Sequence, residues 1–301
     1  MSIQVQKSFA AASESPQGKA PGTLYLVATP IGNLEDMTYR AVRTLQECDI
    51  IAAEDTRQSR KLLNHFEITP RKLVSYHEHN KHNSGPELIR LIMEGQSLAL
   101  ISDAGLPAIS DPGQELVQLA VEQGIAIVPI PGANAALSAL IASGLSTNRF
   151  TFIGFLPRDH RGQAEVLQGA RAAEGTLLFY ESPHRIIKTL QAILEHVGNR
   201  RIVLARELTK RHEEWLRASV EEALEWLEEH PPLGEYCIVL EGQSQEEAIA
   251  EANEWWQALS IAEHVAHYEQ TEQLSRKDAM KRTAKDRQLS KRDIYQVLLE
   301  E

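Results

Sequence analysis

Charged side chains that could transfer a proton or bind phosphate stand directly after a short apolar run in the first part of the chain. Glu54, Asp55 and Arg57 follow the run Ile50–Ala53. Two acids and an arginine are costly to bury at the end of a strand unless they find partners. An arginine suits phosphate because its planar fork makes two parallel hydrogen bonds. The motif therefore indicates either charges that pair with one another or a site that grips a hydroxyl or phosphate.

Two further charged motifs follow apolar runs later in the chain, at Phe179–Arg185 and Ala205–His212. Their cations would bring positive charge to a cleft, or they would neutralise the glutamate-rich segment that follows. This segment, from residue 213 to residue 254, holds thirteen glutamates and one arginine. The cations in question are Arg185, Arg206, Lys210 and Arg211.

Several common kinds of site are not indicated by the sequence. His77 and His79 would point the same way on a strand, but no carboxylate stands near them at metal-site spacing. We therefore predict no metal site, and a polar loop that contacts substrate is the better interpretation. Glycines spaced as G-x-G are absent, as are the phosphate-binding G-x-x-x-x-G-K and the hydrolase G-x-S-x-G patterns.

Three loops rich in proline and glycine are each preceded by an apolar run, and they span Val27–Asn33, Ser102–Gly113 and Pro129–Ala136. In a parallel sheet, ligand sites form at the strand tips. Proline fixes φ there, and glycine lets the backbone approach a ligand closely. One such loop could be an ordinary turn, but three at similar positions predict a rigid pocket lined largely by backbone. Asp103 could accept hydrogen bonds from a ribose or amine, or it could cap a turn, and Asp111 could merely start a helix.

The elements that must position these residues follow an α/β rhythm. Apolar runs that resemble buried strands alternate with helical patterns from residue 23 onward. We predict two α/β domains with a cleft between them and a small helical C-terminal segment. The predicted bounds are a disordered leader at 1–22, an N-terminal domain at 23–135, a C-terminal domain with a mixed sheet at 136–242, a linker at 243–253 and helices at 254–301.

The last segment carries two helix-start signals. Ser275 with Asp278, and Ser290 with Asp293, have the capping-box spacing. Eight Lys and Arg residues lie between residues 276 and 293, although the net charge of the whole chain is −11. Two short helices of this kind resemble a helix-turn-helix unit, which would either contact RNA or only pack against the rest of the protein.

Bulk properties restrict the setting. A length of 301 residues fits two or three domains. Cys48 and Cys237 are the only cysteines, and neither has companions at disulfide or zinc spacing. A reducing, cytoplasmic setting is therefore expected. No apolar run approaches the roughly 20 residues of a membrane helix, so no membrane partner is predicted.

Several of these motifs together resemble the RsmI family, the bacterial ribosomal RNA small-subunit methyltransferases of the tetrapyrrole-methylase (class III methyltransferase) superfamily. The resemblance is strong from residue 22 to residue 242. It implies two α/β domains that enclose S-adenosylmethionine, usually in a homodimer. It also implies methyl transfer to the ribose 2′-oxygen of cytidine 1402 in 16S rRNA. The motifs are Thr23–Leu34, Ala53–Arg57, Ser102–Gly105, Gly154–Pro157, Phe179–Arg185 and Ala205–Lys210.

The resemblance also implies where the cofactor binds. Its positions map onto the three loops and onto the tip of a second-domain strand. Two departures from the superfamily pattern, Leu106 in place of threonine and Ala133 in place of proline, weaken any side-chain role at these two positions. The implied cofactor-binding residues are Pro30, Ser102, Asp103, Ala104, Leu106, Asn134, Ala135 and Tyr180.

For the chemical step, we expect Glu54, Asp55 or Glu181 to take the proton of the hydroxyl or to orient it. The small ribosomal subunit is the expected partner, and its RNA would contact Arg57, Arg185, Arg206, Lys210, Lys277, Lys281 and Arg282. Two alternatives remain open. One is a methyltransferase of the same fold that acts on a small molecule, and the other is a non-catalytic factor that binds ribosomes.

Overall fold

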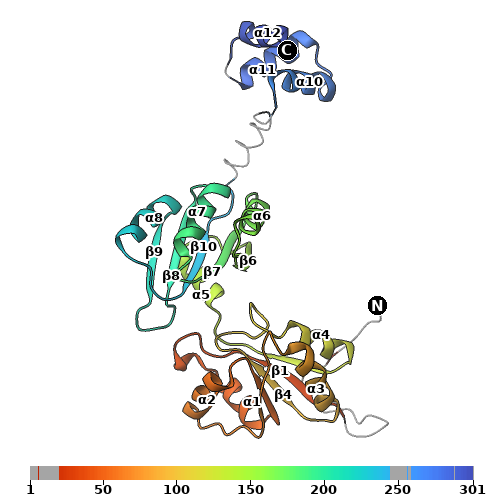
Figure 1. Ribbon diagram of the computed structural model, residues 1–301, viewed down its shortest axis with the longest axis vertical. Coiled ribbons are helices and arrows are strands. Elements are labelled where there is room, and N and C mark those ends of the chain that lie inside the picture. The colour runs from red at the N-terminus through yellow and green to blue at the C-terminus, as the bar shows by residue number, and fades with distance from the viewer. Residues whose placement is uncertain (1–5, 7–19, 245–255, 257–258, 288, 301) are drawn as a thin grey trace. The chain divides into compact units, whose positions relative to one another are not determined.

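The computed structural model describes residues 6, 20–244, 256, 259–287 and 289–300 (Figure 1). The predicted leader and linker lie almost wholly outside the described residues. The chain divides into two compact units, each described here by itself. The larger unit holds residues 1–170 and 175–241, and the smaller unit holds residues 171–174 and 242–301.

The larger unit begins with a five-stranded parallel sheet in the order β3-β2-β4-β1-β5. All the residues of β2 and β4 are buried, as the unbroken apolar runs at these positions predict. The strands are β1 (Thr23–Val27), β2 (Ile50–Ala53), β3 (Leu73–Ser75), β4 (Leu98–Ile101) and β5 (Ala126–Ile130).

Helices cover both faces of this first sheet (Figure 1). On one face, α1 (Tyr39–Glu47) and α2 (Thr56–His65) pack Leu45 and Leu63 against Ile51. On the other face, α3 (Lys81–Met93) and α4 (Gln114–Glu122) pack against the alternate residues of the same strands. After β1 the chain continues to the face that α1 covers, and after β4 it continues to the face that α4 covers. Because β1 and β4 are neighbours in the sheet, a crevice forms between the two loops that follow them.

The second sheet has the order β6-β7-β10-β8-β9. Only β6 and β7 run parallel, and the other neighbours are antiparallel, which makes the sheet mixed. Thus the predicted fold class of two α/β domains is confirmed. The strands are β6 (Phe150–Phe155), β7 (Thr176–Glu181), β8 (Arg201–Arg206), β9 (Glu214–Ser219) and β10 (Tyr236–Leu240).

One face of the second sheet is covered by α5 (Ala135–Ser143), whose Ala139 and Leu140 pack against Leu178 and Val239. Three helices form a neighbouring series, in which α7 (Ile186–His196) contacts both α6 (His160–Ala170) and α8 (Val220–Glu229). Because successive strand residues face opposite sides, Tyr180 faces α5 while Glu181 faces α7.

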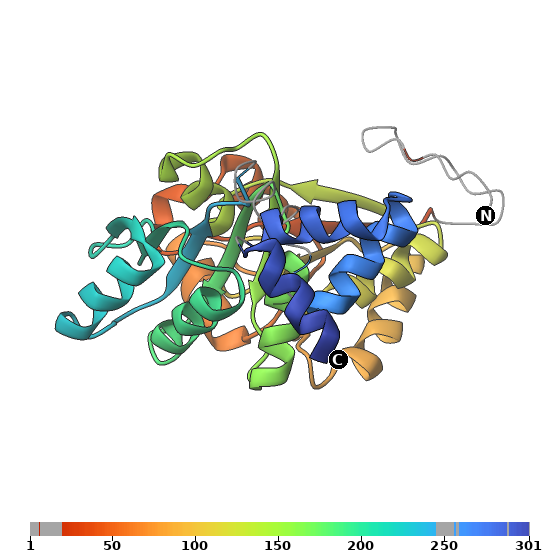
Figure 2. The same cartoon turned by 90° about the horizontal axis from the view of Figure 1, so that it is seen from above.

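The smaller unit contains α10 (Ile261–Thr271), α11 (Arg276–Asp286) and α12 (Lys291–Glu300), which lie together in Figure 2. Their core includes Val265, Tyr268 and Ile294. Ser275 and Ser290 accept hydrogen bonds from the amides of Asp278 and Asp293, which confirms both predicted helix starts. Within the described residues, no helix has the length and apolarity needed to cross a bilayer.

Candidate functional site

The loops that follow β1, β4 and β5 pack closely together in the first domain. The amides of Thr29 and Gly105 each donate to the other residue's carbonyl oxygen, at 2.9 and 3.1 Å. Gly105 has φ +77°, which glycine adopts without strain. At Gly132, an added Cβ would lie 2.8 Å from the Cβ of Ala28. The sequence thus places glycine where these loops approach one another most closely.

A cavity of about 430 Å³ opens at these loops and extends to the strand ends of the second sheet. Nine of the predicted site residues line it: Glu54, Asp103, Ala104, Leu106, Asn134, Ala135, Tyr180, Glu181 and Lys210. The lining residues outside the predicted set include Ile109, Asp111, Phe155, Leu208 and Tyr236. Ile109 and Asp111 lie in the Ser102–Gly113 loop, and Phe155 and Leu208 lie in the motifs Gly154–Pro157 and Ala205–Lys210. Membership of these segments is the signal that could have revealed them.

A second cavity of about 400 Å³ adjoins the first. The predicted cofactor residues Pro30 and Ser102 line only this second cavity. Asp103, Ala104 and Lys210 line both, so they form part of a wall that the two cavities share. The loops after β1 and β4 therefore lie at the boundary between the two adjoining cavities.

Three carboxylates, those of Glu54, Asp103 and Asp111, lie at the first cavity. Burial raises the pKa of all three. Repulsion adds to this effect: Asp111 and Asp103 raise the pKa of Glu54, Asp103 raises that of Asp111, and Asp55 raises that of Asp103. Hydrogen bonds from the Asp103 amide to Glu54 and from Ser102 to Asp111 oppose it in part. Among the described residues, no cation forms an ion pair with these carboxylates. Such a cluster can bind a cationic ligand.

The backbone around the first cavity is strained. Ser110 and Glu207 line the cavity with φ of +61° and +51°, and Ala108 and Thr209 beside them have φ of +66° and +65°. Non-glycine residues rarely take this conformation, and those that do cluster at functional sites. The strain marks the loop after β4 and the turn after β8 as parts of one site.

Tyr180 and Asn134 fix the start of α5 at the cavity. The Tyr180 hydroxyl accepts a hydrogen bond from the Ala136 amide at 3.2 Å, and burial raises the pKa of this hydroxyl to about 12. The Asn134 side chain accepts from the Leu137 amide at 2.9 Å and so caps the helix. Both side chains thus hold the loop after β5 against the second sheet.

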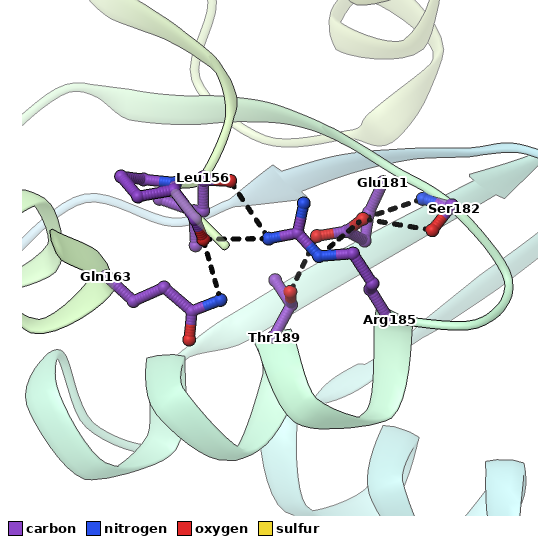
Figure 3. Close-up of polar contacts among 7 residues, drawn as sticks. Leu156, Gln163, Glu181, Ser182, Arg185 and Thr189 are labelled. Atoms are coloured by element: carbon purple, nitrogen blue, oxygen red, sulfur yellow. Dashed lines mark hydrogen bonds and ion pairs between the residues drawn. The ribbon is translucent and has the colours of Figure 1, made fainter. Parts of the chain in front are cut away.

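Glu181 is almost fully buried, and its carboxylate is held by the residues around it (Figure 3). One oxygen accepts from the Ser182 amide at 2.8 Å, and the other accepts from the Thr189 hydroxyl at 2.7 Å. The Nε of Arg185 lies 3.6 Å from the first oxygen. The carboxylate therefore ties the end of β7 to α7.

Arg185 takes part in the same network of polar contacts (Figure 3). Its Nη2 donates to the carbonyl oxygens of Leu156 and Pro157, both at 2.9 Å. Gln163 donates to the Pro157 carbonyl as well, at 3.0 Å. These contacts join the loop after β6 to α6 and α7, so the guanidinium has a structural role in the second domain.

Lys210 lies on the wall that both cavities share. Its Nζ is 2.8 Å from a carboxylate oxygen of Glu207 and 2.8 Å from one of Glu235. Burial alone would lower the pKa of Lys210, but these two carboxylates outweigh burial and raise it. Gly32 makes room for the side chain, since an added Cβ there would lie 2.4 Å from the Lys210 Cγ. The ammonium is therefore charged and firmly placed.

Other predicted site residues lie outside both cavities. Asp55 caps α2 and pairs with Arg57, whose side chain is 87% exposed. Arg206 donates to the Leu233 carbonyl at 2.7 Å and pairs with Glu214 at 3.3 Å. The remaining three, Lys277, Lys281 and Arg282, are exposed on α11 of the smaller unit.

The two histidines of the Tyr76–Asn80 segment lie in the turns that precede α3 and not on a strand. The described part of the chain contains no group of three or more His, Cys, Asp or Glu side chains arranged to hold a metal ion.

Comparison with known proteins relates this arrangement to one family. Residues 23–224 match the family of Tetrapyrrole (Corrin/Porphyrin) Methylases. A protein of Halalkalibacterium halodurans named ribosomal RNA small subunit methyltransferase I is 55% identical, over 93% of this chain and 96% of the relative. The Bacillus subtilis protein of the same name is 50% identical, over 91% and 93%.

Solved structures of low sequence identity share the fold. A uroporphyrin-III C-methyltransferase from Thermus thermophilus, complexed with S-adenyl homocysteine, aligns over 73% of this chain and 97% of its own. Its TM-score is 0.51, at 21% identity. Diphthine synthase aligns over 76% and 94%, with a TM-score of 0.58 and 15% identity. The two-domain arrangement is therefore that of this group of methyltransferases.

Proposed function

The chain belongs to the tetrapyrrole (corrin/porphyrin) methylase family, and from this premise we propose that it methylates the ribose 2′-oxygen of cytidine 1402 in 16S rRNA, with S-adenosylmethionine as the methyl donor. The observation that carries the proposal is the 55% identity, over 93% of the chain, to a protein named ribosomal RNA small subunit methyltransferase I. The small ribosomal subunit is then the partner. We further propose a cytoplasmic homodimer, as expected for the family that the sequence resembles.

The charge of the first cavity supports binding of this cofactor. The carboxylates of Glu54, Asp103 and Asp111 have no cationic partner among the described residues, and the cofactor carries a sulfonium and an ammonium. The six residues proposed to hold it in this cavity are Asp103, Ala104, Leu106, Asn134, Ala135 and Tyr180. Pro30 and Ser102 support the same loops from the second cavity. When bound, the cofactor supplies a methyl group that is already activated for transfer.

The remaining chemical requirement is to align the ribose hydroxyl and to accept its proton. Asp103 lines both cavities, whereas Glu54 lines only the first. We therefore assign the proton to the Asp103 carboxylate, whose pKa is raised by burial and, to a smaller extent, by the charge of Asp55. Asp55 and Glu181 act as positioning residues in this proposal, because their carboxylates are held by α2 and by α7 respectively.

The test is methylation of isolated subunits. Purified protein is incubated with labelled cofactor and with 30S subunits from cells that lack this gene, and ribose methylation is then mapped along the 16S rRNA. We expect close to one methyl group per subunit, on the ribose of cytidine 1402, and at least about a 100-fold loss of rate for Asp103→Asn.

Each contrary outcome has a distinct meaning. Methylation of a base, or of a different nucleotide, would contradict the proposed specificity. Transfer to a tetrapyrrole but not to subunits would favour a small-molecule enzyme. Calorimetry that finds no cofactor binding would favour a non-catalytic factor.

A further inference from the structure

The second cavity differs from the first in what lines it. One wall is α2, which contributes Gln58, Ser59, Lys61 and Leu62. The opposite walls are the loops after β1 and β4. At Asp103, Ala104 and Lys210 the cavity meets the first one, so a group bound in either cavity lies next to a group bound in the other.

The charges of the two cavities are complementary. The first presents the carboxylates of Glu54 and Asp111, which do not line the second and have no cationic partner among the described residues. The second adds the ammonium group of Lys61 to that of Lys210, which both cavities share. An ammonium has three N–H donors. Lys61 gives one to the Gln58 side chain at 2.9 Å, and Lys210 gives two to Glu207 and Glu235. Both ammonium groups therefore retain donors for an anion.

A buried hydroxyl on α2 also lacks a partner. Ser59 is 4% exposed, and its Oγ makes no hydrogen bond among the described residues. Its amide is satisfied by the Asp55 carbonyl, so only the side chain remains unpaired. Leaving such a group unpaired in a protein interior is unfavourable. The Oγ atom is itself closed to solvent, although Ser59 lines the second cavity. A rotation about χ1 would turn the hydroxyl into that cavity, where a polar ligand would satisfy it.

From these three observations we propose that the second cavity receives the acceptor nucleotide of an unpaired RNA segment, with Lys61 binding its phosphate and the Ser59 hydroxyl bonding to a polar atom of the nucleotide. This rests on the proposed function. The base lies against the apolar side chains of Leu34 and Leu62, and the ribose faces Asp103 on the shared wall. Enzymes that modify nucleotides admit a single unstacked residue in this way. Arg57 stands one helical turn before Lys61, where it can meet the adjoining phosphate.

The experiment compares Lys61→Gln with Arg60→Gln, its exposed neighbour on α2, which lines neither cavity. The probes are unmethylated 30S subunits and, separately, the cofactor alone. We expect Lys61→Gln to raise KM for subunits about tenfold and to reduce the salt slope of binding by about 0.7–0.9, the loss of one phosphate contact. Cofactor affinity should stay within about twofold of wild type, and Arg60→Gln should change none of these quantities.

Ser59→Ala gives a second, independent readout. Because the hydroxyl is unpaired without RNA, its removal should leave the unfolding temperature unchanged or slightly higher, yet KM for subunits should rise about fivefold. A lower unfolding temperature with an unchanged KM would overturn the role of Ser59. Equal behaviour of Lys61→Gln and Arg60→Gln would overturn the role of Lys61. Wild-type protein that binds the cofactor but leaves subunits unmethylated would instead refute the proposed function itself.

Discussion

At the scale of single residues, the first cavity contains a cluster of carboxylates whose like charges destabilise the folded protein. Glu54, Asp103 and Asp111 lose hydration and repel one another, and the described residues supply no cation to offset this. Without ligand, their ionised forms destabilise the folded protein. A cationic cofactor would relieve the repulsion. The carboxylates therefore lower the stability of the ligand-free protein and strengthen binding of the cofactor.

Glu54→Gln tests this exchange. The pKa of Glu54 is raised in the folded protein, so protonation stabilises the fold and ionisation weakens it as the pH rises. At pH 8, without cofactor, the variant should unfold about one or two degrees above wild type, and the gap should close as the pH falls below 5.

Thermal unfolding at both pH values measures this gap, and calorimetry should show weaker cofactor binding by the variant. Glu47→Gln, an exposed change at the end of α1, is the control and should show neither effect. A gap that widened on acidification would contradict the account.

The sequence reveals site residues that lie within motifs, but it does not reveal which side chains they contact. Asp103 is indicated by its glycine- and proline-rich loop as well as by the family resemblance, whereas Asn134 and Tyr180 are implied by the resemblance, and all three line the first cavity. Asp111 was left as a possible helix start, and Ser59 was not noticed, because burial without a partner is visible only in three dimensions. The pairing of Arg206 with Glu214 depends likewise on a strand pairing that no local pattern reveals.

At the scale of elements, β2 coincides with the apolar run Ile50–Ala53 that the sequence marks, since burial on both faces leaves a clear signal. The edge strands β3 and β9 carry no such signal. The first has three residues, and the second has no fully buried residue. The turn after β8 was equally hidden, because its strained residues Glu207 and Thr209 carry no local signal for positive φ.

Gly234→Ala tests how this turn is held. Gly234 has φ +72°, and an added Cβ would lie 2.5 Å from the Cγ of Glu207. Glu207 would have to move, and Lys210 would lose one of its two carboxylate partners. We expect a loss of stability and a higher KM for subunits.

The matched control is Gly124→Ala, with φ +67° and no atom within 4 Å of the added Cβ. It should lose about 1–2 kcal/mol through backbone strain alone and keep its activity. Denaturant unfolding and steady-state kinetics of both variants decide the matter. Equal losses in both would mean that the contact with Glu207 is unimportant.

At the scale of the whole molecule, acidic and basic residues are segregated along the chain. The net charge is −11, yet α11 and the start of α12 concentrate Lys and Arg in the smaller unit. Part of this charge is structural, because Arg287 donates to the carbonyl of Trp256 and to Nδ1 of His264. Arg282 stacks over the ring of Tyr268. The exposed lysines of α11 are therefore better candidates for contact with RNA.

The double variant Lys277→Gln/Lys281→Gln tests that role. The two lysines lie one turn apart on α11, are exposed, and lie outside the core of the smaller unit, so the unit should still fold. If each contacts one phosphate, the salt slope of binding to 30S subunits should fall by about 1.4–1.8, and affinity at physiological salt should fall at least about tenfold. Binding of the cofactor should not change, because the first cavity is lined only by residues of the larger unit. Lys72→Gln, an exposed lysine that lines neither cavity, controls for the loss of charge itself. An unchanged salt slope in the double variant would mean that the smaller unit contributes no phosphate contact through these lysines, and the grip on RNA would then lie in the larger unit, at Lys61 and Arg57.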